Sequence, residues 1–440
     1  MSSFSTFQPT WGVKELRDIP ISLIDGDRGK NYPSHQEFSG EGFCLFLNTG
    51  NIKDDRFDFS KCDFITEQKD ALLRKGRLVR GDIVLTTRGT VGSVGYFYDD
   101  IPYEHIRINS GMVILRCGDG LSSRYFYQLF KSRILKLQFE LFSSGSAQPQ
   151  LPIKDLRRVR LPIPKPCVQR KVAAILSAYD DLIENNKRRI ALLEKLAEEI
   201  YREWFVRLRF PSHENTKLIR GVPRGWHVAE LRELATINPS SISRRDKPER
   251  ILYIDISSVS TNRIEEVTAY EGSEAPGRAR RRVKHGDIIW SSVRPANRAY
   301  CLIYEPPENL IVSTGFAVIR PHASTPFTFL NFAVTSHAFV DQMTVVARGA
   351  AYPATSFEDF EKAKVLVPSA TLLETFHETT EPLFRQRHVL SLQRDYLTAT
   401  RDILLPRLIS GKLSVENLDI HFPPGMVEEL DQNLDDSHHA

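Results

Sequence analysis

The sequence contains no long apolar run and no cysteine pattern typical of a bridged or metal-bound fold. Its longest apolar stretches, such as 251–256, are far shorter than the roughly 18 residues that a membrane-spanning helix needs. The five cysteines are widely spaced and include no Cys-x-x-Cys pair. These absences exclude a membrane protein and a disulfide framework, and with no visible secretory signal we expect a cytoplasmic protein with reduced thiols.

Motifs that carry catalysis are also missing. No Gly-rich loop ends in Gly-Lys-Ser/Thr, as a nucleotide-dependent motor would require. Amino-methyltransferases carry an Asn/Asp-Pro-Pro-aromatic motif. The most similar string here, at 238–241, lacks the second proline and the aromatic residue. The twelve histidines form no His-Glu-x-x-His pattern. We therefore expect no catalytic and no metal-binding residues in this chain.

The composition is that of a globular protein with a basic body. Hydrophobic residues make up 41% and charged residues 26% of the sequence, which is usual for a globular protein. The length of 440 residues predicts more than one domain. The net charge is only +4, but residues 416–440 hold seven Asp and Glu and no Lys or Arg. We expect this acidic segment to be a disordered tail. The remaining chain is more basic than the total and is compatible with a polyanionic partner.

An internal repeat of about 200 residues gives the strongest signal in the sequence. It begins with a Trp-x-Val-x-Glu-Leu-Arg motif at Trp11 and again at Trp226. Further matches follow in the same order in both copies: 46–52 with 253–259, 80–84 with 285–289, 110–116 with 314–320, 145–149 with 349–353, and 161–164 with 365–368. The chain therefore contains one structural unit twice.

Each unit begins with short alternating strands and ends with a helical period after a Pro-rich exit. In the first unit the helical seam alternates steps of four and three, as in a coiled coil. Its members are Val172, Leu176, Tyr179, Ile183, Asn186, Ile190, Leu193, Ala197, Ile200 and Trp204. In the second unit Phe376, Leu383, Leu390, Leu397 and Leu404 recur every seven residues, and Pro382 is expected in a first helical turn.

The economical arrangement packs the two helices against each other, antiparallel, with the β modules at opposite ends. Helices that pack only onto their own modules are the alternative. The fold class is then α+β, with two tandem mixed, mostly β modules separated by long antiparallel coiled-coil helices in a pseudo-twofold internal repeat. The predicted boundaries are 1–165 and 213–369 for the modules, 166–212 and 370–415 for the helices, and 416–440 for the tail.

Polar and basic residues gather in two loops of each module. Arg can bond two acceptors of guanine, Asn or Gln two edges of adenine, and Ser or Thr a phosphate, so these loops suit the reading of DNA. The predicted DNA-binding residues are Thr86, Thr87, Arg88, Ser144, Ser146 and Gln148 in the first module, and Ser291, Ser292, Arg294, Asn297, Arg298, Arg348 and Tyr352 in the second. A solvated basic face is the plain alternative.

The helical motif resembles a known family. The string from Gln169 to Leu196, continuing to Trp204-Phe205, looks like the specificity subunit of type I restriction-modification systems, and 404–413 is similar to that family's C-terminal repeat. The resemblance covers roughly residues 10–418. One departure is that the distal helix has Leu373-Glu-Thr-Phe376 where the central copy has Gln169-Arg170. The two surfaces for partners are therefore not expected to be equivalent.

The resemblance implies two target-recognition domains that each read one half of a bipartite site in double-stranded DNA. It implies helices that bind two methyltransferase subunits, which methylate adenine, and restriction/translocase subunits. S-adenosylmethionine, ATP and Mg are expected in those partners and not in this chain. The partner-binding or coiled-coil residues would be Leu176, Tyr179, Ile183, Asn186, Ile190, Leu193, Ile200, Trp204, Leu383, Leu390, Leu397 and Leu404.

Two other readings stay open. In one the chain is a protein-binding scaffold with two β modules on a helical spacer; in the other it is itself a methyltransferase or nuclease, which would require motifs that the sequence lacks. A helix from Val172 to Trp204 would rise roughly 50 Å, compared with about 34 Å for one duplex turn. The helices could therefore act as a spacer between two DNA-reading modules.

Overall fold

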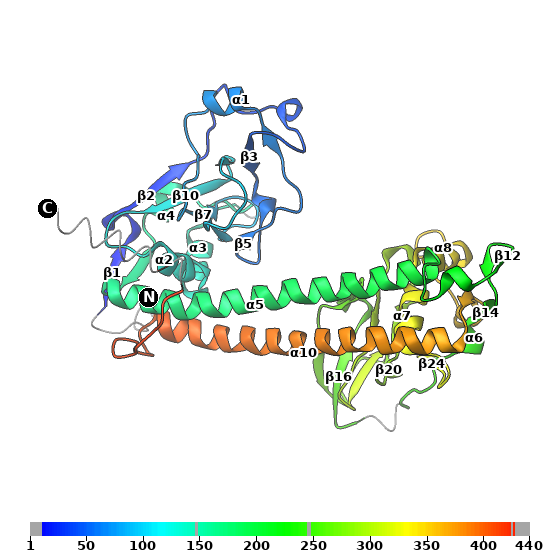
Figure 1. Ribbon diagram of the computed structural model, residues 1–440. Coiled ribbons are helices and arrows are strands. Elements are labelled where there is room, and N and C mark those ends of the chain that lie inside the picture. Colours follow the sequence, from blue (N-terminus) through cyan, green and yellow to red (C-terminus); the bar gives the residue numbers. More distant parts are fainter. Residues whose placement is uncertain (1–10, 146–147, 244–247, 424–425, 427–440) are drawn as a thin grey trace. The chain divides into compact units, whose positions relative to one another are not determined.

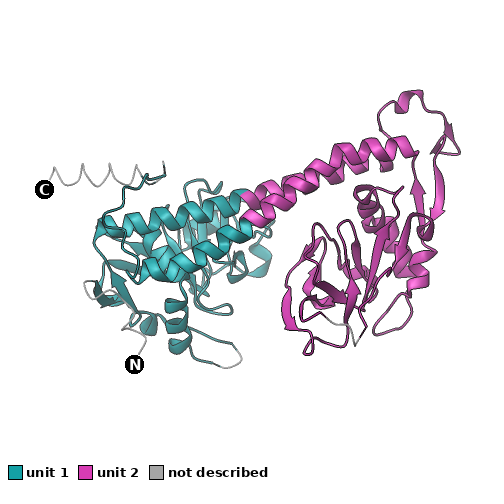
Figure 2. Ribbon diagram, turned by 90° about the horizontal axis from the view of Figure 1, so that it is seen from below, with its two compact units in different colours: residues 1–185, 394–440 teal, residues 186–393 magenta. Residues whose placement is uncertain are grey.

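The computed structural model describes residues 11–145, 148–243, 248–423 and 426 (Figure 1). The fold is mixed α and β, as predicted, with several small sheets and two long helices. The chain divides into two compact units, Met1–Asn185 with Arg394–Ala440 (unit 1) and Asn186–Gln393 (unit 2) (Figure 2). Within the described ranges, no helix combines the length and apolarity that a membrane crossing requires.

The described part of unit 1 holds a four-stranded sheet, a three-stranded sheet, two two-stranded ribbons and four short α-helices. The four-stranded antiparallel sheet has the order β2 (Ile21–Asp25), β10 (Met112–Cys117), β7 (Ile83–Thr86), β8 (Val94–Tyr96). The three-stranded sheet has the order β6 (Phe64–Ile65), β3 (Cys44–Leu47), β9 (Ile106–Ile108); β1 (Gly12–Glu15) pairs with β11 (Arg160–Ile163) and β4 (Ile52–Lys53) with β5 (Arg56–Phe57). The helices are α1 (Glu67–Leu72), α2 (Ser123–Lys131), α3 (Arg133–Phe142) and α4 (Ile153–Leu156).

Unit 2 repeats this topology, with one more strand in its second sheet and an additional two-stranded ribbon. Its four-stranded antiparallel sheet has the order β15 (Ala235–Ile237), β24 (Phe316–Pro321), β21 (Ile288–Ser291), β22 (Tyr300–Leu302). A second sheet has the order β19 (Thr268–Glu271), β16 (Arg250–Ile254), β23 (Leu310–Ser313), β20 (Ala279–Arg282); β14 (His227–Glu230) pairs with β25 (Lys364–Val367), β17 (Val259–Ser260) with β18 (Arg263–Ile264), and β12 (Leu218–Ile219) with β13 (Val222–Pro223). The helices are α6 (Leu231–Leu234), α7 (Phe327–Thr335), α8 (His337–Val346) and α9 (Phe357–Glu361).

The repeated Gly-Asp-Ile and Arg motifs meet as a buried ion pair in each unit. Arg116 donates from Nε and Nη2 to the two carboxylate oxygens of Asp82, both at 2.8 Å. Arg320 does the same to Asp287, at 2.8 and 2.6 Å. Both aspartates are buried and also accept a main-chain N–H from the preceding turn. The bidentate geometry offsets the cost of burying the charges, so this part of the repeat is structural.

Two long helices leave the β modules and pass through both units. α5 covers Pro166–Tyr201 and continues into a π-helical turn at Arg202–Val206. Its counterpart in the second repeat is α10, at Ala370–Ile409. Within each unit the segments of α5 and α10 lie side by side and antiparallel. Their predicted seam residues, from Leu176 to Trp204 and from Leu383 to Leu404, are buried or half-buried, whereas positions 187–189 and 194–196 are exposed.

Pro382 corrects one prediction, because it lies inside α10 and not in a first turn. A proline within a helix removes the hydrogen bond to the carbonyl four residues earlier and costs about 3 kcal/mol. That carbonyl belongs to Glu378, and both Glu378 and Pro382 are exposed, so water can satisfy it. Burial of Phe376 and Phe384 on the opposite side holds the helix through this point.

The expectation of a disordered tail from residue 416 onward is wrong for its first part. Ile420 and Phe422 pack against the core of unit 1, and Met426 is buried in that core. Lys171 on α5 donates from Nζ to the main-chain oxygens of Glu416 and Leu418, at 2.8 and 2.7 Å. The prediction of disorder rested on the many acidic residues of 416–440 and gave no weight to these three apolar residues. Residues 427–440 of the predicted tail lie outside the described residues.

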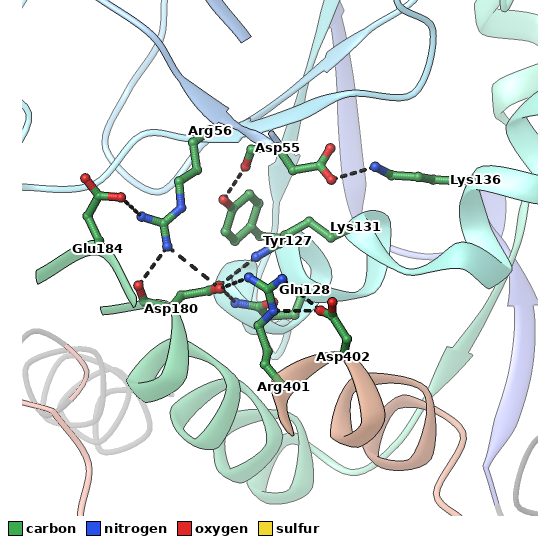
Figure 3. Close-up of polar contacts among 10 residues, drawn as sticks. All are labelled: Asp55, Arg56, Tyr127, Gln128, Lys131, Lys136, Asp180, Glu184, Arg401 and Asp402. Atoms are coloured by element: carbon green, nitrogen blue, oxygen red, sulfur yellow. Dashed lines mark hydrogen bonds and ion pairs between the residues drawn. The ribbon is translucent and has the colours of Figure 1, made fainter. Parts of the chain in front are cut away.

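A buried carboxylate ties together the parts of unit 1. Asp180 on α5 is 1% exposed and accepts hydrogen bonds from Lys131 (2.6 Å) and Gln128 (2.8 Å) on α2 and from Arg401 (2.9 Å) on α10 (Figure 3). Arg56 on β5 donates to the main-chain oxygen of Asp180 at 2.9 Å. Burial alone would raise the pKa of Asp180, but Lys131, Gln128 and Arg56 outweigh it and hold the pKa at about 2.

We predict that Asp180→Asn lowers the free energy of unfolding by about 3 kcal/mol, because it leaves Lys131 and Arg401 buried or half-buried without their shared counter-charge. Urea unfolding of the full chain, followed by circular dichroism, measures the change. Since the folded pKa of about 2 lies below the ordinary 3.8, the contribution of Asp180 is present above the ordinary value and is lost as the pH falls toward 2.

The matched control is Asp402→Asn, which removes an exposed carboxylate 2.8 Å from the same Arg401. An exposed ion pair contributes at most about 1 kcal/mol, so this variant should stay close to the wild type. Equal losses for the two variants would show that the buried network is not what holds unit 1.

Candidate nucleic-acid interface

In unit 1 the structure brings the two predicted loops side by side. The loop between β7 and β8 follows Thr86, and the second loop follows α3. The main-chain N–H of Leu151 donates to the oxygen of Thr87 at 2.9 Å, which joins the loops at their base. Ser144 and Gln150 exchange two main-chain hydrogen bonds of 2.9 Å, so the second loop is closed on itself. Both loops therefore leave the module from one place.

The same arrangement occurs in unit 2. The N–H of Thr355 donates to the oxygen of Ser292 at 2.8 Å, and that of Arg294 to the oxygen of Pro353 at 2.7 Å. Arg348 and Ala354 exchange two hydrogen bonds of 2.9 Å and close the second loop. Each unit thus presents one pair of joined loops at the end of its four-stranded sheet.

Four predicted contacts are structural and correct the sequence interpretation. Thr86, Thr87, Ser291 and Ser292 are buried, and their hydroxyls donate to main-chain carbonyls. Thr87 and Ser292 occupy equivalent positions and bond Gly111 and Gly315, at 3.0 and 2.8 Å. The hydroxyl of Thr86 bonds the carbonyl of Thr90, and that of Ser291 bonds the carbonyl of Val293 at 2.9 Å. Because a hydroxyl has one hydrogen to donate, these groups hold the loops and do not face a ligand.

Other predicted residues lie on the exposed tips. In unit 1 these are Arg88, Ser144 and Gln148; Ser146 lies outside the described residues. In unit 2 they are Arg294, Asn297, Arg348 and Tyr352. The guanidinium of Arg348 lies 3.5 Å from Asp359 and is largely exposed, so this ion pair leaves it free to move to another anion.

Arg294 is held in a defined position. Its φ of +50° is uncommon for a residue other than glycine, and its guanidinium lies 4.6 Å from the ring centroid of Tyr352. Nη2 also donates to the main-chain oxygen of Ala351 at 3.3 Å. Tyr352 is 70% exposed, so it supports the arginine without burying it. The pair offers a pre-positioned cation for an anion or a guanine edge.

Arg298 differs from the prediction, because it does not lie with the loop tips. It is half-buried, and its Nη2 lies 2.5 Å from Nδ1 of His337 at the start of α8. It lines a cavity between the loop, α8 and the long helices of unit 2. Within the described ranges, no three His, Cys, Asp or Glu side chains come together as a metal site would need.

Sequence reasoning missed a second apolar stripe on α10. Val389 and Leu392 in unit 2 are exposed and three residues apart, and Tyr396 and Ile403 in unit 1 are exposed and seven apart, so each pair shares a face of α10. On α5, Leu182, Leu192 and Leu196 are exposed as well. The stripe could have been found by testing each helix for more than one seam. Since the predicted seam residues are buried or half-buried in the chain itself, the exposed stripe is the better candidate for contact with a partner.

The chain is similar to known proteins in sequence and in fold. Residues 9–195 match the family model described as "Type I restriction modification DNA specificity domain". The chain is 28% identical over 360 residues to the type I restriction enzyme MjaIX specificity subunit of Methanocaldococcus jannaschii, which covers 77% of this chain and 79% of that protein. The putative MjaX specificity subunit of the same organism is 21% identical over 420 residues, 92% of this chain and 94% of the relative.

A solved structure shows the same fold. The S subunit of a type I restriction-modification system from M. genitalium matches with a TM-score of 0.61 and 17% sequence identity, over 94% of this chain and 97% of the other.

We predict that Ser292→Ala lowers the free energy of unfolding by about 1 kcal/mol, because it removes one hydrogen bond to Gly315. Amide hydrogen exchange at Ser292 and Thr355 should quicken at the same time. Asn297→Ala, a change at the exposed tip of the same loop, should alter neither. A Ser292 variant as stable as the wild type would indicate that the hydroxyl is free for another role.

Proposed function

We propose that this chain is a DNA specificity subunit of a type I restriction-modification system, and that each of its two β modules reads one half of a bipartite site in double-stranded DNA. As a member of this family it is a recognition subunit and not a catalytic one. One observation carries the proposal: units of the same topology present the same pair of joined loops, closed by equivalent hydrogen bonds.

The tips of the two loop pairs differ, which supports the reading of two different half-sites. Unit 1 offers Arg88 and Gln148, whereas unit 2 offers Arg294, Asn297 and the ring of Tyr352. Arg bonds the O6 and N7 acceptors of guanine, and Asn or Gln bonds adenine, in each case through two hydrogen bonds. The buried Thr87 and Ser292 would keep the loops rigid while the exposed side chains adjust.

We further propose that the long helices space the modules and bind the partner subunits. The partners would be two methyltransferase subunits, which methylate adenine, and restriction/translocase subunits. S-adenosylmethionine, ATP and Mg would be held by those partners. The exposed apolar residues of α10, Val389 and Leu392 in unit 2 and Tyr396 and Ile403 in unit 1, suit contact with an amphipathic helix from a partner.

The proposal is tested by co-expressing the chain with a type I methyltransferase subunit from the same genome and mapping N6-methyladenine in the host DNA. The expected result is a motif with two fixed halves around a nonspecific spacer. A stable complex that methylates no motif would contradict the reading and leave a protein-binding scaffold. The scaffold also predicts no salt-dependent DNA binding, whereas several phosphate contacts would make affinity fall steeply with salt.

We predict that Arg294→Ala weakens recognition of one half-site only. Loss of a bidentate contact costs about 1–3 kcal/mol of discrimination. Binding of the assembled methyltransferase complex to duplexes with either half altered measures the effect. Arg88→Ala serves as the matched change in unit 1 and should affect the other half. Equal loss on both halves would contradict the assignment of one half-site to each module.

We predict that Leu392→Asp prevents assembly with the methyltransferase subunit, because it places a charge in the apolar stripe. The matched control is Gln393→Asp, which adds the same charge at the next, exposed position of α10. Size-exclusion chromatography of the co-expressed proteins distinguishes the two. An intact complex with Leu392→Asp would show that the partner binds elsewhere, and an unchanged circular dichroism spectrum excludes unfolding as the cause.

A further inference from the structure

The segment around strand β20 of unit 2 carries a concentration of positive charge that the tips of the DNA-reading loops do not include. Five of the seven residues at 278–284 are Arg or Lys and none is acidic. These five residues, called the β20 cations below, are Arg278, Arg280, Arg281, Arg282 and Lys284. Among the residues that the structure describes, none of the five forms an ion pair with a carboxylate, and the printed side-chain hydrogen bonds of Arg280 and Arg281 go to neutral oxygens.

The β20 cations are open to an anion. Arg278, Arg282 and Lys284 are exposed, and Arg281 is half-buried. Nη1 of Arg281 donates to the hydroxyl of Ser241 at 3.2 Å, and its guanidinium lies 5.0 Å from the ring centroid of Phe357. Burial lowers the pKa of Arg281, and no carboxylate opposes this effect. A bound anion would favour its charged form.

Hydrogen bonds join this strand to the base of the loops within unit 2. β20 is the last strand of its sheet and pairs with β23. Just beyond that pairing, the N–H of Thr314 donates to the oxygen of Arg278 at 2.9 Å. The next residue, Gly315, accepts the N–H of Ser292, also at 2.9 Å. Since neighbouring strands are about 5 Å apart, roughly 10–15 Å separate Arg278 from Ser292.

The second loop adjoins the same strand. Phe357, which contacts Arg281, is the first residue of α9 and follows that loop directly. The β20 cations therefore lie beside both loops and not on a remote surface of the module.

This separation suits a single duplex. The major groove of DNA is about 12 Å wide, and a row of phosphates follows each of its edges. When the loop tips meet base edges in the groove, a strand roughly 10–15 Å from the loop base comes to the level of a phosphate row. Arg and Lys side chains are common donors to phosphate oxygens, and such contacts carry no sequence information.

The equivalent segment of unit 1 uses part of its charge internally. Residues 74–80 precede the Gly-Asp-Ile motif as 278–284 do, and they contain four cations. Arg77 forms an ion pair with Asp70. Arg80 donates to three main-chain oxygens at 2.5–3.2 Å. One of the four charges is thus neutralised and a second is fixed on the module, whereas none of the β20 cations is matched by a carboxylate among the described residues.

From the concentration of cations without carboxylate partners, their link to the loops and the contrast with unit 1, we propose that the β20 cations bind the phosphate backbone of DNA beside the half-site that unit 2 reads. The inference rests on the proposed function and deepens it. Unit 2 carries the larger share of the salt-dependent affinity, and unit 1 depends more on its contacts to bases.

The test measures how DNA affinity depends on salt in the full chain assembled with its methyltransferase subunits. The double variant Arg278→Gln/Arg282→Gln removes two exposed charges from the segment. Its slope of log affinity against log salt should be smaller than that of the wild type by about 1.8, because each phosphate contact contributes about 0.9. Between 50 and 200 mM salt the wild type should then lose about twelvefold more affinity than the variant. Fluorescence anisotropy of a labelled duplex gives both values.

The matched control is Arg232→Gln/Arg263→Gln, which removes the same charge from two other exposed arginines of unit 2. Each of them is paired with a glutamate, at 2.5 and 3.0 Å. The slope of this variant should equal that of the wild type. An equal fall in both double variants would show that net charge acts and not the β20 segment, which would overturn the proposal.

A second readout separates phosphate contacts from the reading of bases. The double variant at β20 should weaken binding by the same factor on a duplex with the intact motif and on one with the half-site of unit 2 altered, because phosphates are the same in both. A loss confined to the intact motif would overturn the proposal, since it would make these arginines readers of bases.

The remaining outcomes are equally distinct. A wild-type slope in the Arg278→Gln/Arg282→Gln variant would overturn this inference and leave the proposed function intact. A wild-type complex that binds no DNA would overturn both. Failure of the variant to assemble with the methyltransferase subunit on size exclusion, with an unchanged circular dichroism spectrum, would assign the segment to a protein contact and also contradict the proposal.

Discussion

The burial of one carboxylate, Asp180, constrains the whole of unit 1. A carboxylate taken out of water must be matched by cations and donors in good geometry. Here α2 and α10 supply hydrogen bonds to the carboxylate, and Arg56 of β5 supplies a cation 3.7 Å from it. The β module and both helix segments can meet only where these groups converge (Figure 3). The network therefore selects one register for the helices, which apolar seam residues alone would leave open.

Unit 2 solves the same packing problem with rings in place of charges. Phe376 lies between Trp204 and Phe205, with centroids at 5.7 and 4.9 Å, and Phe384 replaces the buried carboxylate. Apolar packing tolerates an incomplete fit better than a charge tolerates a missing partner. This is why a cavity can remain in unit 2, whereas the same space in unit 1 has to be filled.

The joined loops have a fixed base and an exposed tip. Small hydroxyl residues at the base of each loop are buried and bond main-chain carbonyls, while long polar side chains at the tips remain exposed. A loop fixed at its base loses little conformational entropy when its tip meets a ligand. Under the proposed function, a change of side chain at the tips would alter the DNA sequence that is bound without disturbing the module.

The repeat, the fold class, the two loop pairs and the family could all be read from the sequence, because repeated motifs and the spacing of apolar residues are local signals. The sequence could not show that Thr86 and Ser291 turn inward, that Pro382 sits within a helix, or that Ile420 and Phe422 return to the core. Nor could it show the network at Asp180 or the cavity beside Arg298. Each of these depends on which distant side chains meet, and only the tertiary structure decides that, because burial and hydrogen-bond partners are properties of the packed chain.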